Sequence, residues 1–250
     1  MPKDNKNVTI KSNQSSAKND KNSIYILDFT KIFHALKEDK YFIILLLNVF
    51  FISLIYYQIF ILLPHQLEYY FSNNLKVHNI FYSVVSFLFN IGKNNSKLSN
   101  FIFGYLFLEN TVIIIISQIF FNKLQQKINN KLSFIIGLSS IGVAYILYSL
   151  STTNINMYLV GMLFLSIGEI FSLPRIPIIT NLLSRDENKG MYFGIVKSVR
   201  SIGVSLGPFL CGIIMSLTNT SFTWILFFIF ILFAIFFNIK FGVFKVAIVE

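Results

Sequence analysis

Long apolar runs separated by short polar segments dominate the chain after residue 40. A helix needs about 20 mostly apolar residues to cross a bilayer, and six of the runs are near that length. The pattern therefore predicts an all-α membrane protein with six transmembrane helices in one domain, residues 41–240. The predicted spans are residues 41–63, which end at Pro64, then 101–121, 132–150, 158–183, 192–217 and 222–239.

The two ends of the chain are polar. Residues 1–23 are rich in Asn, Lys and Ser without an apolar run, so we expect a disordered cytoplasmic tail or linker. In residues 24–40, apolar side chains recur at helical spacing, which predicts an amphipathic helix on the membrane surface. Residues 241–250 are expected to form a second cytoplasmic tail.

The segment between the first two spans, residues 72–100, is harder to interpret. Its apolar part, His78 to Ile91, is too short to cross a bilayer. We therefore expect an interfacial or re-entrant helix there.

Composition and charge agree with a membrane protein. The chain is 54% hydrophobic and 13% charged, whereas soluble domains contain about 25% charged residues. The net charge is +10, and the basic residues collect at the ends and in the loops Lys123–Lys131 and Arg185–Lys189. By the positive-inside rule, both termini lie in the cytoplasm, and the membrane is the plasma or inner membrane. A basic arm that binds nucleic acid is the weaker alternative because acidic residues dilute its charge, so we expect lipid and no nucleic acid as partner.

Other chemistry finds little support in the sequence. The single cysteine, Cys211, excludes a disulfide within the chain and a cysteine-based metal site. There is no nucleotide-binding motif and no cluster of His, Asp or Ser near an interface. We therefore expect no cofactor, no metal and no enzymatic activity.

Seven polar residues within the spans are candidates for a substrate and proton pathway. Charged groups inside a membrane are energetically costly and usually face a bundle interior or a watery cavity. All seven belong to the first, second, fourth and fifth spans, which we expect to face one another or a cavity, with the third and sixth as outer supports. This period of three indicates two three-helix repeats. The candidates are Gln58, Glu109, Asn110, Glu169, Arg175, Lys197 and Arg200.

The roles of these ionisable residues stay open at this level. Proton coupling would use Glu109 or Glu169. Glu169 either serves transport or proton coupling, or is neutralised by protonation or by a structural partner such as Lys197 or Arg200 on the next span. Those two cations either attract an anionic group or hold the acids. Arg175 either lines the pathway or extends to the cytoplasmic side.

Small residues and prolines mark helix contacts or hinges. Gly203 and Gly207 form a GxxxG spacing, which places both glycines on one face and allows a neighbouring helix to approach closely. Proline inside a span loosens the backbone. Packing and a hinge for alternating access are both open readings. The residues concerned are Gly168, Pro174, Gly203, Gly207, Pro208 and Gly212.

Four stretches carry a family resemblance over roughly residues 35–240. They are Gly168-Glu169 followed by Pro174, the segment Lys189 to Gly194, the pattern Gly203-x-x-x-Gly207-Pro208-x-x-x-Gly212, and the segment Lys37 to Pro64. Together they resemble the carboxyl-terminal half, helices seven to twelve, of a major facilitator superfamily transporter near the drug:proton antiporter branch. The resemblance implies a secondary active transporter, or half of one, that moves a small organic solute by alternating access with proton-coupled drug or solute efflux.

Two features depart from that family pattern. The loop 122–131 lacks the glycines and the aspartate of the family motif at this place, and the segment between Phe71 and Phe101 is longer than usual. The resemblance covers one six-helix half, so a second half or a homodimer is the expected partner. The alternative function is a non-transporting membrane subunit or a decayed transporter fragment.

Overall fold

The computed structural model describes residues 39–73, 95–151, 154–184 and 186–241. The predicted tail 1–23, nearly all of the helix 24–40, the apolar piece His78–Ile91 and residues 242–250 lie outside these ranges. The chain divides into two compact units, residues 1–39 and 40–250, and the following description concerns the second. Its described residues form helices and turns with no strand, which confirms the all-α prediction.

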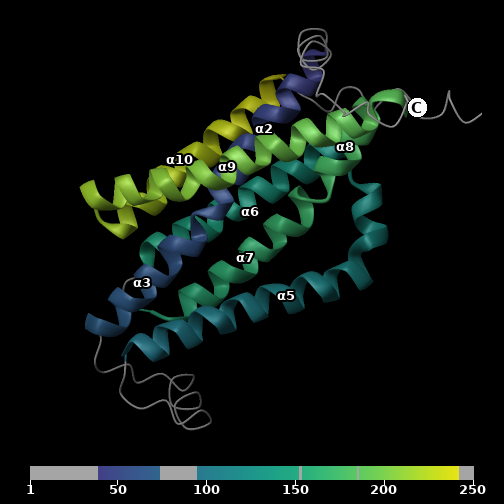
Figure 1. Ribbon diagram of the computed structural model, residues 1–250. Helices are drawn as coiled ribbons and strands as arrows, with labels where there is room; N and C mark the ends of the chain where they lie inside the picture. The colour runs from purple at the N-terminus through teal and green to yellow at the C-terminus, as the bar shows by residue number, and fades with distance from the viewer. Residues whose placement is uncertain (1–38, 74–94, 152–153, 185, 242–250) are drawn as a thin grey trace, which may run out of the picture. The chain divides into compact units, whose positions relative to one another are not determined.

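Six helical spans are long and apolar enough to cross a membrane, as predicted. Two of the spans are divided into two helices, and a short 3₁₀ helix precedes the fifth. In chain order the elements are α2 (Lys40–Tyr57), α3 (Ile59–Asn73), α5 (Asn95–Lys127), α6 (Asn130–Leu150), α7 (Asn156–Ser172), α8 (Arg175–Leu183), η2 (Asp186–Asn188), α9 (Lys189–Leu217) and α10 (Thr220–Phe241) (Figure 1).

The first span does not end at Pro64, so that boundary was wrong. The helix breaks earlier, at Gln58, and α3 then continues through Pro64 to Asn73. Proline has no N–H and its ring crowds the carbonyl four residues before it, so it disturbs the preceding turn rather than the following one. At the break, the carbonyl of Gln58 accepts from the backbone N–H groups of both Ile61 and Leu62, at 2.9 Å each.

Two predicted loops are shorter than the sequence suggested. The helix α5 continues beyond its apolar part to Lys127, so only Ile128 and Asn129 connect it to α6. Lysine and glutamine are good helix formers, which explains the extension. Similarly, the segment Lys189–Gly194, expected in part as a loop, forms the first turns of α9.

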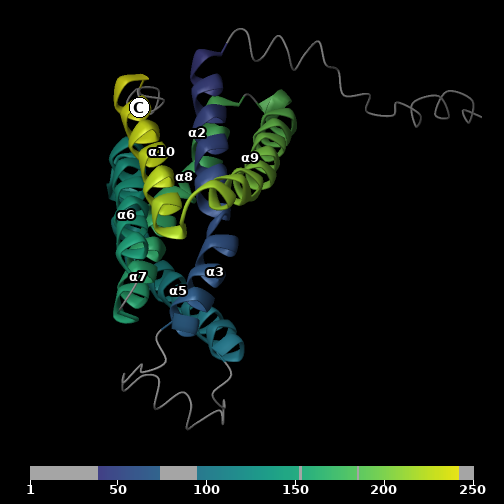
Figure 2. The same cartoon turned by 90° about the vertical axis from the view of Figure 1, so that its left-hand side faces the viewer.

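The prolines act differently in the fourth and fifth spans. Helix α7 ends at Ser172 and α8 starts at Arg175, so the fourth span breaks at Pro174 as a proline in a helix predicts. Helix α9 continues through Pro208 without a break. Figure 2 shows that α9 nevertheless curves along its length.

The helix contacts follow the predicted pair of three-helix repeats. Helix α2 packs against α9 and α10, while α7 packs against α5 and α6, and α6 packs against α10. Exchanging α2 with α7, α5 with α9 and α6 with α10 reproduces the same set of contacts. The second helix of each repeat thus packs against the first helix of the other, as two structural repeats require.

The expectation that the third and sixth spans are outer supports is wrong for the third. In the most apolar stretch of α6, 61% of the residues are buried, compared with 22% in the second span and 17% in the fifth. Its tyrosines Tyr145 and Tyr148 are fully buried and pack around Trp224 of α10. The first span is buried to the same extent as α6, so the core includes both, and the second and fifth spans are the most exposed of the six.

Candidate functional site

A buried carboxylate joins three of the predicted pathway spans. Glu169 on α7 is 9% exposed. Its Oε1 accepts a hydrogen bond from the Tyr56 hydroxyl at 2.6 Å and another from Asn110 Nδ2 at 2.7 Å. Since Tyr56 lies on α2 and Asn110 on α5, the side chain of Glu169 connects the first, second and fourth spans.

The fifth span reaches the same cluster through Arg200. Its Nη2 donates to the Tyr57 hydroxyl at 2.8 Å, and its guanidinium lies 5.9 Å from the centre of that ring. The rings of Tyr56 and Tyr57 meet edge to face, with centres 5.4 Å apart. The tyrosine pair of the first span thus contacts Glu169 of the fourth span through Tyr56 and Arg200 of the fifth span through Tyr57.

The predicted partner of Glu169 on the next span is wrong. Both donors to Glu169 are neutral, and no lysine or arginine of the described ranges forms an ion pair with it. Arg200 instead binds Tyr57 and is exposed, and Lys197 is also exposed on α9. No role was predicted for Tyr56, although a tyrosine pair inside an apolar span was a signal that could have identified it.

The second acid, Glu109, lies next to Asn110 on α5 and is half-buried. Its Oε2 is buried and forms no hydrogen bond with any residue that the structure describes. Unpaired buried carboxylate oxygens are energetically costly, so this group is placed to bind a proton or a polar ligand.

Gln58 occupies a different place from the other candidates. It is fully buried, and its Nε2 donates to the Tyr145 hydroxyl at 3.1 Å. Tyr145 in turn donates to the carbonyl of Ile55. These bonds connect the helix break at Gln58 to α6, and the structure does not bring Gln58 into the group around Glu169.

Arg175 lies in another polar group, at the start of α8. The side chain is buried among protein residues. Its Nε donates to Ser133 Oγ and its Nη1 to Asn130 Oδ1, both at 3.1 Å. Arg175 therefore holds the beginning of α6 against the break at Pro174.

The predicted packing glycines divide into two kinds. A Cβ at Gly203 would lie 2.7 Å from the carbonyl oxygen of Phe50, and one at Gly207 would overlap the carbonyl of Leu54. At these two positions α9 therefore approaches the backbone of α2 as closely as a GxxxG spacing permits. Gly168 is similarly close to α6, whereas Gly212 faces open space.

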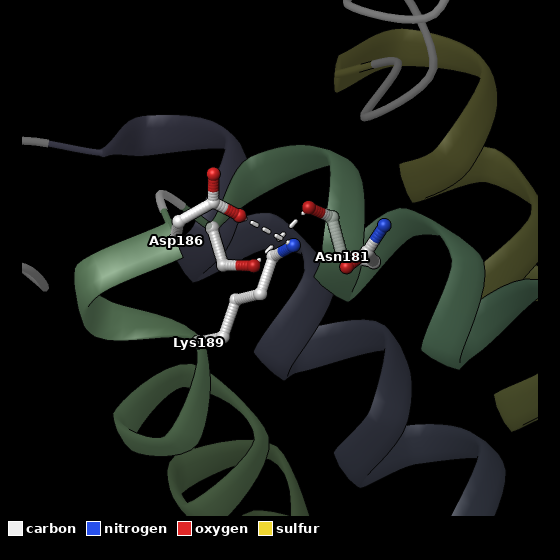
Figure 3. A network of polar contacts seen from close by, with 4 residues as sticks. Asn181, Asp186 and Lys189 are labelled. Atoms are coloured by element: carbon white, nitrogen blue, oxygen red, sulfur yellow. Dashed lines mark hydrogen bonds and ion pairs between the residues drawn. The ribbon is translucent and has the colours of Figure 1, made fainter.

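The turn between α8 and α9 contains a small surface network (Figure 3). Lys189 Nζ lies 2.7 Å from Asp186 Oδ1, and Ser184 Oγ donates to the carbonyl of Asn181 at 3.1 Å. The hydrogen bond and charge of Lys189 lower the pKa of Asp186, which lies outside the spans. Such exposed pairs contribute little to stability, so this network shapes the turn rather than forming a site.

No metal site is found among the residues described, since no three His, Cys, Asp or Glu side chains gather there. The cluster around Glu169 offers hydrogen-bond donors, one acid and an exposed arginine at membrane depth. Such a group can bind a proton and a polar solute, because the acid accepts the former and the arginine attracts anionic parts of the latter.

Comparison with known proteins agrees with the fold. The sequence profile described as Major Facilitator Superfamily matches residues 77–245, which is more than half of the 250-residue chain. The match includes Asn110, Glu169 and Arg200, while Tyr56 precedes it. None of the curated proteins compared with the chain matches it. The profile match, the six spans and the two three-helix repeats lead to one conclusion: this integral membrane protein belongs to the Major Facilitator Superfamily.

Proposed function

We propose that the chain acts as the carboxyl-terminal half of a secondary active transporter for a small organic solute, with Glu169 as the proton-carrying group. The transporter role follows from the family, whose members are transporters. The observation that supports the proton-carrying role is the buried carboxylate of Glu169, held by two neutral donors from two other spans.

The bonding of Glu169 is suited to exchange of a proton. A charged carboxylate within a membrane span and without a cation is energetically costly, and uptake of a proton removes that cost. Both donors bind Oε1, so the other oxygen is available for the proton. Since Tyr56 and Asn110 bind the charged form more strongly than the neutral one, each protonation changes how firmly α7 is held to α2 and α5.

The exposed cations of α9 indicate that a water-filled cavity or a partner protein lies against this face. Arg200 is near the middle of α9, and both Arg200 and Lys197 are exposed on this unit. Charged side chains at that depth avoid lipid and face a water-filled cavity or other protein. A second six-helix half, or a second copy of the chain, covers this face and completes the pathway. Its positive charge favours an anionic or zwitterionic solute, with drug efflux as the role that the sequence resemblance implies.

The alternative is a non-transporting membrane subunit or a transporter remnant. The same hydrogen bonds favour it, because they tie α2, α5 and α7 together whether or not a proton moves. Replacement of Glu169 by glutamine separates the two. The amide oxygen of glutamine still accepts from Tyr56 and Asn110, but the amide takes up no proton at physiological pH.

Everted membrane vesicles containing the full chain provide the assay. The vesicle interior is first made acidic. Anionic, zwitterionic and cationic organic solutes are then added in turn, and a pH-sensitive dye records whether the pH difference across the membrane decreases. We expect at least one solute to release protons with the natural chain and none with Glu169→Gln. The control is Glu68→Gln, an exposed acid on α3, which should behave as the natural chain. Equal proton release by Glu169→Gln at equal protein level would favour the structural role.

The partner is tested by purification from the native membrane in mild detergent. Recovery with a second six-helix polypeptide, or as a stable homodimer, is the expected result. A monomer that is rapidly degraded in the cell would contradict transport by this chain and favour a remnant.

A further inference from the structure

A cavity lies at one end of the bundle, where the end of α6, the start of α7 and the turn from α9 to α10 come together with α3. Its volume is about 410 Å³, within the range of about 300–1,000 Å³ that small-molecule sites occupy. The wall includes Gln66, Tyr69 and Tyr70 of α3 and Ser151 after α6. The cluster around Glu169 contributes none of the lining residues, so this cavity is separate from the proposed pathway.

Tyr158, at the beginning of α7, gives the cavity an unused hydrogen-bonding group. It lines the cavity and is fully buried. The Ser151 side chain lies close enough to interact with its hydroxyl, but no hydrogen bond of standard geometry joins that hydroxyl to any described residue. A buried hydroxyl without a partner costs about 1–3 kcal/mol in general. Such groups are rare in folded proteins, and one on the wall of a cavity is available to a ligand that supplies the missing bond.

The chemistry of the wall restricts the ligand. It combines tyrosine rings, Met215 and several hydroxyl or amide groups, and no Lys, Arg, Asp or Glu side chain is among its described residues. A charged ligand would lose its hydration on entering the cavity, and the wall offers no opposite charge to compensate for that loss. The one titratable side chain besides the tyrosines, His65, is exposed and lies 3.3 Å from the hydroxyl of Thr220.

We propose that this cavity, with the Tyr158 hydroxyl on its wall, binds a small uncharged molecule that has an apolar face and at least one hydrogen-bonding group. The apolar face packs against the tyrosine rings and Met215, and the polar group binds the Tyr158 hydroxyl. This binding does not depend on transport or on Glu169, so it can be tested independently of the proposed function.

The chain contains its own reporter for such binding. Trp224 is the single tryptophan of the sequence, and it is fully buried. Its Nε1 donates to Oε1 of Gln66, which lines the cavity. A ligand that enters the cavity alters the surroundings of Gln66, so the emission of Trp224 should change on binding.

The probes are three molecules of nearly equal shape and different charge: benzamide, benzamidine as the cation, and benzoate as the anion. Each is titrated into the purified full chain in lipid nanodiscs while the emission of Trp224 is recorded. We expect a saturable change with benzamide and no saturable change with either charged molecule. A stronger response to benzamidine or benzoate would overturn the uncharged class. No saturable response to benzamide up to its solubility limit would overturn the site.

Replacement of Tyr158 by phenylalanine tests the proposed contact. The ring and the cavity remain, and only the unpaired hydroxyl is lost, so we expect the empty protein to unfold at the same or a higher temperature. Benzamide should bind about three- to tenfold more weakly, as expected for one lost hydrogen bond. Tyr105→Phe, which alters an exposed tyrosine of α5, is the control and should leave binding unchanged. Unchanged binding to Tyr158→Phe would overturn the role of the hydroxyl.

Discussion

The hydroxyl of Tyr56 donates a 2.6 Å hydrogen bond to the carboxylate of Glu169, a residue 113 positions later in the chain. With Asn110 on the same oxygen, this bond fixes the position of α7 relative to α2 and α5. One acid thus connects helices from both three-helix repeats. Its protonation state can therefore affect how the repeats are held together.

The neighbouring tyrosines Tyr56 and Tyr57 should differ in their effect on stability. Tyr56→Phe removes a largely buried bond to Glu169 and should lower the free energy of unfolding by about 1–2 kcal/mol. Tyr57→Phe removes only the bond to the exposed Arg200, so its effect should stay within about 0.5 kcal/mol. Unfolding of each variant in mixed detergent micelles provides the comparison. Equal effects would show that the Tyr56 bond contributes no more than a surface contact.

The glycines of α9 provide a matched pair for helix packing. Gly207→Ala places a methyl group against the backbone of Leu54 and should destabilise the protein by about 1–3 kcal/mol. Gly212→Ala adds its methyl group in open space, so it should be neutral or stabilise the helix by up to about 1 kcal/mol. Thermal unfolding in detergent measures both. If the two variants unfold at the same temperature, the close contact of α2 and α9 is contradicted.

Substitution of Arg175 and of Arg200 should likewise distinguish a structural arginine from one on the exposed face. Arg175→Ala leaves Asn130 and Ser133 without their donor and should lower the free energy of unfolding by about 1–3 kcal/mol. Arg200→Ala should change it by less than about 0.5 kcal/mol, because Arg200 is exposed on this unit. The same detergent unfolding assay applies. A larger loss of unfolding free energy for Arg200→Ala than for Arg175→Ala would show that Arg200, and not Arg175, has the structural role.

The orientation in the membrane can be tested with single cysteines at exposed turns. Asn129→Cys lies between α5 and α6, and Asn219→Cys lies between α9 and α10. The natural Cys211 is buried and should give a low background. If both termini are cytoplasmic, an impermeant maleimide added to intact cells should label position 219 and should label position 129 only after lysis. The opposite pattern would invert the topology.

The sequence predicted the six spans well because bilayer thickness sets the length of an apolar helix, a local property. It also selected Glu169, Asn110 and Arg200, since charged and amide groups stand out in apolar runs. Their partners could not be predicted, because which helix faces meet depends on contacts between distant segments. Asn48 and Asn238 illustrate this, as they are joined by a buried hydrogen bond across 190 positions.

Local rules also failed at specific places. Pro64 was interpreted as the end of a helix, yet the helix breaks at Gln58 and continues beyond the proline. The absence of charge on the third span suggested a lipid-facing support, yet its tyrosines pack in the core. Proline disturbs the turn before it, which places the break ahead of Pro64. On the third span, packing of the tyrosines against neighbouring helices outweighed the signal from the missing charges.

Infrared difference spectroscopy of the purified full chain in lipid can show directly whether Glu169 takes up and releases a proton. Spectra at a series of pH values are compared for the natural chain and Glu169→Gln. We expect a protonated-carboxyl band that changes with pH in the natural chain and is missing from the variant. If both proteins show the same pH-dependent carboxyl bands, Glu169 does not exchange a proton and the proposed coupling is contradicted.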